Sequence, residues 1–383
     1  MKRRSCLKIL RDVGFTGVMI LALDFTISQF LPPELLDPSM RARAIDKEVY
    51  DYTVRYNHGL RPNLGPMQRL FGSLRYTFQT DRFGFRTGEC AGDDPVTQAT
   101  SSVFVLGDSF TEGVGLAFEK TFPGLMACEW KKHGLTVWNL GVVSHSPSLY
   151  YYHLLDAVRE TSIVPKEIFV FLDLSDIPDE ALNYEEKDGR IVWVRHYYTA
   201  FDPHIMGVSV SRVREFLQHN FMSAALEMAI HDMLRQRKGA RLNASRSHWT
   251  VSAEAMKEFG EKGLAKAALY MDRIVDECRA WNCKLTLIVY PWPDQIAYDS
   301  DDSIQVRYWK QWAQTRSARF IDGFAPFFAE PQKEVLAKYF IPGDVHFSAA
   351  GHRLLFEAVS RSVWSGNTPA ESRPISAKNN KPE

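Results

Sequence analysis

Short apolar runs recur along the chain, and each one stops at a glycine or a polar residue. The first, at 102–107, is followed by Asp108 and Ser109 and predicts a buried strand. Further runs predict strands at 135–140, 168–174, 284–290 and 319–321. Amphipathic stretches predict helices at 120–133, 148–161, 252–281, 303–317 and 349–364. Strands and helices that alternate in this way indicate right-handed βαβ units, and therefore an α/β domain around a parallel sheet.

Three further segments flank or interrupt this pattern. Residues 50–86 are rich in aromatic residues, Arg and Gly, which predicts short strands and turns packed against the domain. Residues 184–250 predict an insertion over one side of the sheet, with an amphipathic helix at about 211–235. The tail at 365–383 is rich in Ser, Pro, Asn and Lys and is predicted to be disordered. The main domain is therefore expected at 76–364, after a linker and extension at 32–75.

The N-terminus combines basic residues at 1–12 with an apolar segment at 13–31. At about 1.5 Å per residue, this segment could nearly cross a hydrocarbon core of about 30 Å. Three interpretations compete: an uncleaved membrane anchor, a cleaved signal peptide and a buried helix. Polar residues interrupt the segment, among them Asp24, and 28–32 make a poor cleavage site. We expect a single-pass anchor in the inner membrane, with the body of the protein on the periplasmic side.

Composition excludes some classes of function. The chain has 383 residues, of which 45% are apolar, enough for one large core. Its 46 basic and 46 acidic side chains cancel, which disfavours a nucleic-acid partner. Neither C-x-x-C nor H-E-x-x-H occurs, and we expect no metal and no cofactor. Of the cysteines at 90, 128, 278 and 283, the last two either pair or pack as small apolar side chains. The oligomeric state stays open.

Candidate chemistry begins at Ser109, because ligands of open α/β sheets bind at the carboxyl ends of the strands. A serine hydroxyl becomes a nucleophile when a base takes its proton and a carboxylate orients that base. Asp344 and His346 lie two residues apart in a predicted loop before the last helix, with Ser348 as its expected N-cap. Taken alone, such a pair is common, and His346 would more often be a structural histidine.

Together, these separate segments resemble a known family. GDSF at 107–110, NLG at 139–141 and D-x-H at 344–346 resemble the first, second and last blocks of the SGNH or GDSL hydrolase superfamily. The order of the segments around them is similar to that of a subgroup with an N-terminal membrane segment. The resemblance implies a flavodoxin-like three-layer α/β/α fold for the domain. It also implies Ser109 as nucleophile, His346 as general base, Asp344 as its orienting partner, and the N–H groups of Ser109 and Gly141 as oxyanion donors.

The chain departs from this family at the third block. The family has an Asn there whose amide is the third oxyanion donor, whereas DLSDIPDE places Ser175 at that position. A hydroxyl donates one hydrogen bond but is shorter than an amide. The nearby acidic residues bind a cation or substrate hydroxyls on one interpretation, and are helix N-terminal charges and solvated loop residues on the other. Residues that are expected to line the site are Asp108, Ser144, His145, Asp176 and Trp292.

The function expected from the resemblance is a membrane-anchored serine esterase or O-acyltransferase. Its substrate would be an O-acyl ester, in the first place an acetyl ester, of a glycan or lipid. The alternative is a glycan-binding or assembly protein that kept the fold and lost efficient catalysis, which Ser175 motivates. The nucleophile elbow of α/β-hydrolases is excluded, because Ser109 lacks a glycine two residues later.

Overall fold

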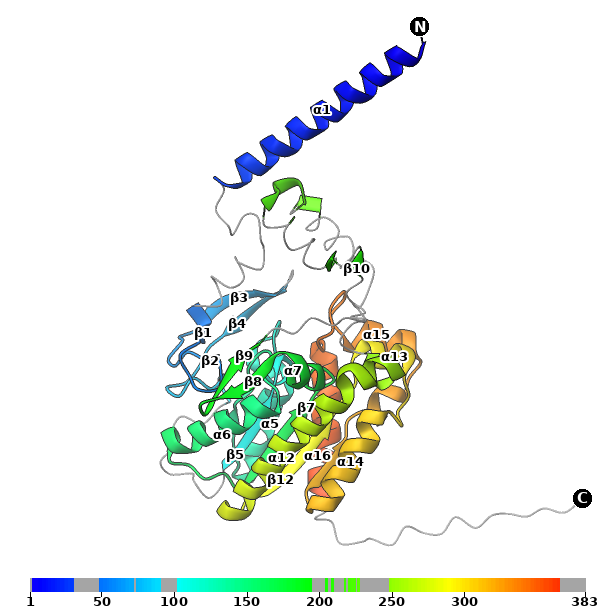
Figure 1. Ribbon diagram of the computed structural model, residues 1–383. Coiled ribbons are helices and arrows are strands. Elements are labelled where there is room, and N and C mark those ends of the chain that lie inside the picture. Colours follow the sequence, from blue (N-terminus) through cyan, green and yellow to red (C-terminus); the bar gives the residue numbers. More distant parts are fainter. Residues whose placement is uncertain are drawn as a thin grey trace, which may run out of the picture.

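The protein is built around a five-stranded parallel sheet (Figure 1). The computed structural model describes residues 2–30, 48–71, 74–90, 102–194, 204–205, 208–209, 217, 220–224, 226–227 and 248–365. The sheet strands are β5 (Ser102–Gly107), β6 (Thr136–Asn139), β7 (Glu167–Leu172), β12 (Lys284–Val289) and β13 (Arg319–Asp322). Their order is β13-β12-β7-β5-β6, which is 2-1-3-4-5 in chain order when read from β6, as in flavodoxin-like sheets. The predicted α/β fold with a central parallel sheet is confirmed.

Helices cover both faces of the sheet. The strand order reverses between β5 and β7, so right-handed crossovers place helices on opposite faces. On one face α5 (Phe122–Trp130) packs against α16 (Ala349–Ser365), and Trp130 Nε1 donates to Ser360 Oγ at 3.2 Å. On the other face α6 (Pro147–Thr161), α12 (Glu261–Trp281) and α14 (Ile304–Arg316) lie side by side (Figure 1). This double cover explains why β5 and β7 are buried almost throughout and read as continuous apolar runs.

Short elements fill the connections. The predicted helix at 252–281 is divided into α11 (Ala253–Ala255), a π-helical turn η5 (Met256–Gly260) and α12. Three helices were not predicted: α7 (Asp176–Leu182), α13 (Pro293–Tyr298) and α15 (Gln332–Tyr339). The remaining short elements are α4 (Ser109–Glu112), η2 (Phe118–Lys120), η3 (Lys131–His133), η4 (His248–Thr250), η6 (Ala325–Phe328), β10 (His204–Ile205) and β11 (Val208–Ser209). Most connections at the carboxyl edge of the sheet are therefore ordered.

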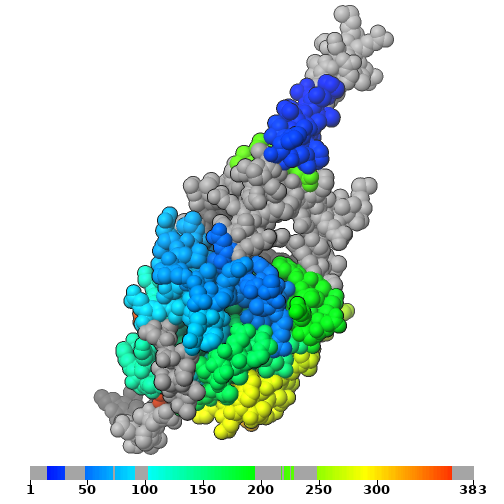
Figure 2. All heavy atoms as spheres, turned by 90° about the vertical axis from the view of Figure 1, so that its left-hand side faces the viewer, coloured from blue at the N-terminus to red at the C-terminus, as the bar shows by residue number. Residues whose placement is uncertain are grey.

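The extension before β5 forms two small antiparallel pairs that pack on the domain. These are β1 (Tyr50–Asp51) with β2 (Gly59–Leu60), and β3 (Met67–Phe71) with β4 (Leu74–Phe78). A third hairpin, β8 (Tyr184–Lys187) with β9 (Arg190–Trp193), lies close to them. Figure 2 shows the extension, in blue, covering one side of the molecule beside the green residues that follow α7. The short strands predicted at 50–86 are present, and they bury apolar side chains such as Phe78 and Tyr76.

Helix α1 (Lys2–Ser28) contains most of the segment predicted to be a membrane anchor. Among the helices that the structure describes, none is both long enough and apolar enough to cross a membrane. The anchor at 13–31 is therefore wrong, and so are the membrane partner and the inner-membrane, periplasmic localisation based on it. The physical reason lies in the polar interruptions. Asp24 in particular accepts hydrogen bonds from the backbone N–H groups of Met222 at 3.1 Å and Ser223 at 3.4 Å.

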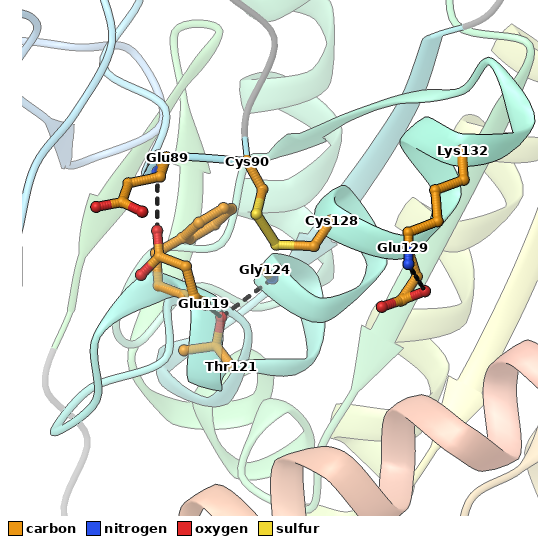
Figure 3. The surroundings of a disulfide bond; sticks show 9 residues. Glu89, Cys90, Glu119, Thr121, Gly124, Cys128, Glu129 and Lys132 are labelled. Atoms are coloured by element: carbon orange, nitrogen blue, oxygen red, sulfur yellow. Dashed lines mark hydrogen bonds and ion pairs between the residues drawn. A yellow bond between two sulfur atoms is a disulfide. The ribbon is translucent and has the colours of Figure 1, made fainter.

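Several sequence predictions fall outside the described residues. They are the linker at 32–47, most of the insertion at 184–250 and the tail at 366–383. Only part of the helix predicted at 211–235 is described, and 222–224 and 226–227 within it are helical. The cysteines are described in part. Cys90 and Cys128 form a disulfide that ties the end of the extension to α5, beside the hydrogen bond from Glu89 N–H to Glu119 (Figure 3). Cys278 and Cys283 are free thiols, so the pairing considered for them is absent from this structure.

Candidate active site

Strand β5 delivers Ser109 to the carboxyl edge of the sheet. The strand ends at Gly107, where a Cβ atom would lie 1.9 Å from Thr111 Oγ1 and 3.0 Å from the carbonyl oxygen of Phe171, so only glycine fits. Asp108 then caps the short helix α4, because its carboxylate accepts from the Phe110 N–H at 3.0 Å. Ser109 is the first residue of that helix, which leaves its backbone N–H outside the helical hydrogen-bond ladder.

The loop before α16 brings a base to this serine. His346 Nε2 lies 2.8 Å from Ser109 Oγ, and its Nδ1 contacts Asp344 Oδ1 in a short hydrogen bond. The backbone N–H of His346 also donates to Asp344 Oδ1, at 3.0 Å. Burial alone would raise the pKa of Asp344, but the hydrogen bond and charge of His346 hold it below its ordinary value, so Asp344 stays ionised. Asp344, His346 and Ser109 thus form a continuous line of hydrogen bonds, although Ser109 lies 237 positions before His346.

Two aromatic rings fix the position of the imidazole. Phe110, which follows Ser109, has its ring centroid 4.8 Å from that of His346, and Phe71 at the end of β3 packs edge-on at 5.2 Å. Phe71 belongs to the extension, so the extension contributes one wall of the site. Ser348 caps α16 as predicted, accepting from the Gly351 N–H at 3.3 Å, which anchors the loop that carries His346.

The groups predicted to hold an oxyanion are engaged elsewhere. The Gly141 N–H donates to Asn139 Oδ1 at 2.9 Å, and its Cα packs so closely on α4 that a Cβ would lie 2.5 Å from Glu112 N. The Ser175 hydroxyl donates to Asp173 Oδ1 at 2.9 Å. Among the described residues, the Ser109 N–H is therefore the one donor of the predicted set that has no acceptor within the protein.

Asp108, Asp173 and Asp176 form a buried acidic cluster behind Ser109. Their nearest carboxylate oxygens all lie within 4.8 Å of one another, and each side chain is at most 2% exposed. Burial and the Asp173 carboxylate raise the pKa of Asp108 well above its ordinary value, and the pKa of Asp176 rises for the same two reasons. Asp108 Oδ2 contacts Ser109 Oγ at 3.1 Å. Asp176 and Asp179 lie in the first turn of α7, so the interpretation as helix N-terminal charges is confirmed for them. The interpretation as solvated loop residues is wrong, because these acidic side chains are buried.

Three of the residues expected to line the site occupy different surroundings. His145 is fully buried and pairs through Nε2 with the carbonyl oxygen of His58 at 2.7 Å, so it lines no open surface. Trp292 is 3% exposed and donates from Nε1 to Asp173 at 2.8 Å, which places it beneath the site. Asp176 is held by the Tyr150 hydroxyl at 3.0 Å. Ser144 is exposed, with a left-handed φ of 59°, and its carbonyl oxygen accepts from Tyr184.

Sequence reasoning missed the buried junction that supports α4. Glu112 is 0% exposed and accepts from the Tyr50 hydroxyl at 2.9 Å and the Val143 N–H at 2.9 Å, while Arg69 Nη1 lies 3.4 Å away. Beside it the buried Arg86 guanidinium donates to backbone carbonyls at the end of α4 and after it. The extension therefore stabilises α4, the short helix that begins at Ser109. The only sequence signal was the concentration of Arg and aromatic residues at 50–86.

Comparison with protein-family models finds no match, and comparison with curated proteins finds none. Similar solved structures include a lipolytic protein of the G-D-S-L family from Desulfitobacterium hafniense DCB-2, 15% identical with a TM-score of 0.37, covering 68% of this chain and 98% of that one. The acetylxylan esterase Axe2 from Geobacillus stearothermophilus is 13% identical with a TM-score of 0.36, and the match covers 69% of this chain and 94% of Axe2. A GDSL-like lipase from Bacteroides thetaiotaomicron is 11% identical with a TM-score of 0.37, and the match covers 71% of this chain and 92% of the lipase. The first and the third of these proteins carry GDSL, the motif that the sequence blocks resemble, in their names. At such TM-scores the likeness carries no argument about activity, which rests on the site itself.

Proposed function

We propose that the protein is a serine hydrolase that cleaves O-acyl esters through an acyl-enzyme. One observation carries the proposal: Ser109 Oγ lies 2.8 Å from His346 Nε2, while Asp344 accepts from the opposite ring nitrogen. This contact fixes the tautomer in which Nε2 is free to take a proton. The ionised Asp344 then stabilises the imidazolium that forms.

The reaction follows from these contacts. Ser109 Oγ attacks the ester carbonyl carbon as its proton moves to His346 Nε2, giving a tetrahedral oxyanion. The carbon–oxygen bond to the alcohol breaks, and His346 gives the proton to the leaving oxygen. Water then attacks the acyl-enzyme, passes a proton to His346, and Ser109 leaves with that proton as the acid is released. A hydroxyl in place of water would give acyl transfer, which shares the first half-reaction.

The acidic cluster fits this chemistry through the charge of Asp108. An ionised Asp108, 3.1 Å from Ser109 Oγ, would repel the oxyanion and compete with His346 for the serine proton. The raised pKa keeps Asp108 protonated to higher pH than an ordinary aspartate. The neutral carboxyl thus leaves His346 as the acceptor of the Ser109 proton.

The full chain tests the proposal directly. We expect turnover of p-nitrophenyl acetate and labelling by a fluorophosphonate, and a loss of both in Ser109→Ala. His346→Gln should lower kcat by about 10³-fold or more, because the serine then has no base. Ser300→Ala, at an exposed serine after α13, is the matched control and should behave as wild type. Labelling of the wild type no stronger than that of Ser109→Ala would refute the enzyme proposal.

A second candidate function is a glycan-binding or assembly protein with an impaired oxyanion hole. The observation in its favour is that Gly141 N–H and the Ser175 hydroxyl both donate within the protein. Loss of one oxyanion donor costs about 10²- to 10³-fold in rate. On this proposal an O-acetylated oligosaccharide binds the wild type and Ser109→Ala equally, and the wild type turns over esters no faster than Ser109→Ala. Ser175→Asn turns them over at least tenfold faster than the wild type. Turnover that is substantial in the wild type and unchanged in Ser175→Asn contradicts it.

A further inference from the structure

The end of α12 brings two cysteines together through its backbone geometry. Asn282 has a left-handed φ of 56°, the Cys283 N–H donates to the Cys278 carbonyl oxygen at 2.8 Å, and the Asn282 N–H donates to that of Arg279 at 3.3 Å. These two bonds define a Schellman motif, in which the side chains six positions apart, counting both ends, pack against each other. The usual apolar pair at these positions is here a pair of thiols.

The two thiols differ in access and in acidity. The interaction between the two thiols raises the pKa of Cys278, which burial raises further, and it lowers the pKa of Cys283. Cys278 is 4% exposed, whereas Cys283 is partly exposed. Both line a cavity of about 410 Å³ that also receives Arg279 and Lys284. An accessible thiol of lowered pKa beside a buried partner is the arrangement of an attacking cysteine and a resolving cysteine.

The pair is separate from the site of Ser109. Cys283 immediately precedes β12, and Glu167 and Arg319, which line the same cavity, begin the neighbouring strands β7 and β13. The cavity therefore lies at the amino edge of the sheet, whereas Ser109 lies at the carboxyl edge. Chemistry at this pair of thiols is therefore independent of the proposed ester chemistry.

We propose that Cys278 and Cys283 form a redox-active dithiol that closes reversibly into a second disulfide. The Cys283 thiolate attacks a low-molecular-weight disulfide RSSR, forming a mixed disulfide and releasing RS⁻. Cys278 then loses its proton and attacks Cys283 Sγ, which releases the second RS⁻. Two protein thiols are oxidised by two electrons, RSSR is reduced to two thiols, and the two protons pass to these thiolates. The new bond ties the last turn of α12 to the start of β12.

Oxidised glutathione and peptide mapping test this in the full chain, with Cys6→Ser as background so that only two free thiols remain. Trypsin cuts after Arg279 and after Lys284, and Arg273 precedes Cys278, so a disulfide joins two separate peptides, 274–279 and 280–284. We expect these peptides to be joined after native oxidation, with no thiol left for N-ethylmaleimide, and to separate after dithiothreitol. Two alkylated thiols after oxidation would overturn the proposal.

Single variants separate the roles of the two thiols. Cys278→Ser should stop at the mixed disulfide and carry one glutathione on Cys283. Cys283→Ser should stay unmodified, because Cys278 is buried and has the higher pKa. Equal modification of both variants, or a glutathione on Cys278 alone, would contradict the assigned order of attack. Ester turnover is expected to be unchanged in both. Because the wild-type mapping stands by itself, a variant that fails to fold leaves the proposal falsifiable.

Discussion

Replacing Glu112 with Gln tests whether the buried junction behind Ser109 depends on a carboxylate. Glu112 Oε2 accepts from Tyr50 and from the Val143 N–H, and Oε1 faces Tyr50 and Arg69. Gln has the same shape but a single acceptor oxygen. With that oxygen toward Val143, the amide N–H groups face the Arg69 guanidinium. In the flipped orientation they face the Val143 N–H, so two donors oppose each other either way.

The expected cost follows from burial. Breaking a buried ion pair typically costs about 3–5 kcal/mol, and an unsatisfied buried donor about 1–3 kcal/mol. The side chain of Arg69 is 12% exposed and that of Glu112 0%, and the Tyr50 hydroxyl can adapt to an amide. We therefore expect Glu112→Gln to lower the free energy of unfolding by about 3 kcal/mol. At a slope of about 3 kcal/mol per molar urea, the midpoint moves by about 1 M.

Urea unfolding followed by tryptophan fluorescence measures this, with Glu129→Gln as the matched control. Glu129 pairs with Lys132 at 2.7 Å on the surface of α5, where the two side chains are 50% and 68% exposed (Figure 3). An exposed pair of this kind contributes at most a few tenths of a kcal/mol. If Glu112→Gln unfolds at the same urea concentration as Glu129→Gln, the reasoning about the buried carboxylate is refuted.

Two further predictions concern stability. Burial, and the charge of His58, lower the pKa of His153 to about 3. Between pH 6.5 and pH 3, His153 is therefore protonated in the unfolded chain and neutral in the folded chain. His153 therefore destabilises the fold as pH falls toward 3, by roughly 1.4 kcal/mol per pH unit. In urea titrations at pH 7, 6, 5 and 4, His153→Phe should show a shallower loss of stability than the wild type, and parallel curves would contradict this. The Cys90–Cys128 disulfide spans 38 residues, so Cys90→Ser/Cys128→Ser should lose roughly 4 kcal/mol in the same assay, and an unchanged urea midpoint would disprove it.

The sheet and its main helices were predictable because their sequence signals are local. A strand buried on both faces reads as a continuous apolar run, as Phe169, Val170 and Phe171 do in β7. The meeting of Ser109 with His346, 237 positions later, was also within reach. Parallel strands expose their carboxyl ends at one edge, so a serine after β5 and a loop that follows β13 converge there. The parallel topology thus brings these residues together although they are far apart in the sequence.

The junction around Glu112 was not predictable, because its partners come from segments whose docking leaves no local pattern. The sequence around Tyr50 and Arg69 does not indicate a buried acceptor. An acidic residue at the end of a short helix, such as Glu112 in α4, is interpreted by default as a solvated charge. The prediction for the N-terminal segment was wrong for the opposite reason, because a local pattern is present there but is not specific. Basic residues followed by apolar ones are shared by anchors and ordinary helices, and Asp24 decides between them only through a partner at 222–223.

The third block shows that Ser175 cannot be judged apart from Asp173, which lies two residues before it. Judged alone, Ser175 is a short substitute for an oxyanion amide, and the question is whether its hydroxyl reaches. In the fold, Asp173 Oδ1 accepts from Ser175 N–H at 2.6 Å and from Ser175 Oγ at 2.9 Å, while Oδ2 accepts from Trp292. An amide has two N–H groups where a hydroxyl has one, so an Asn at 175 would donate one to Asp173 and keep the other for an oxyanion. The donor that this loop offers to an oxyanion is therefore set by Asp173, which already accepts the hydrogen bond of the Ser175 hydroxyl.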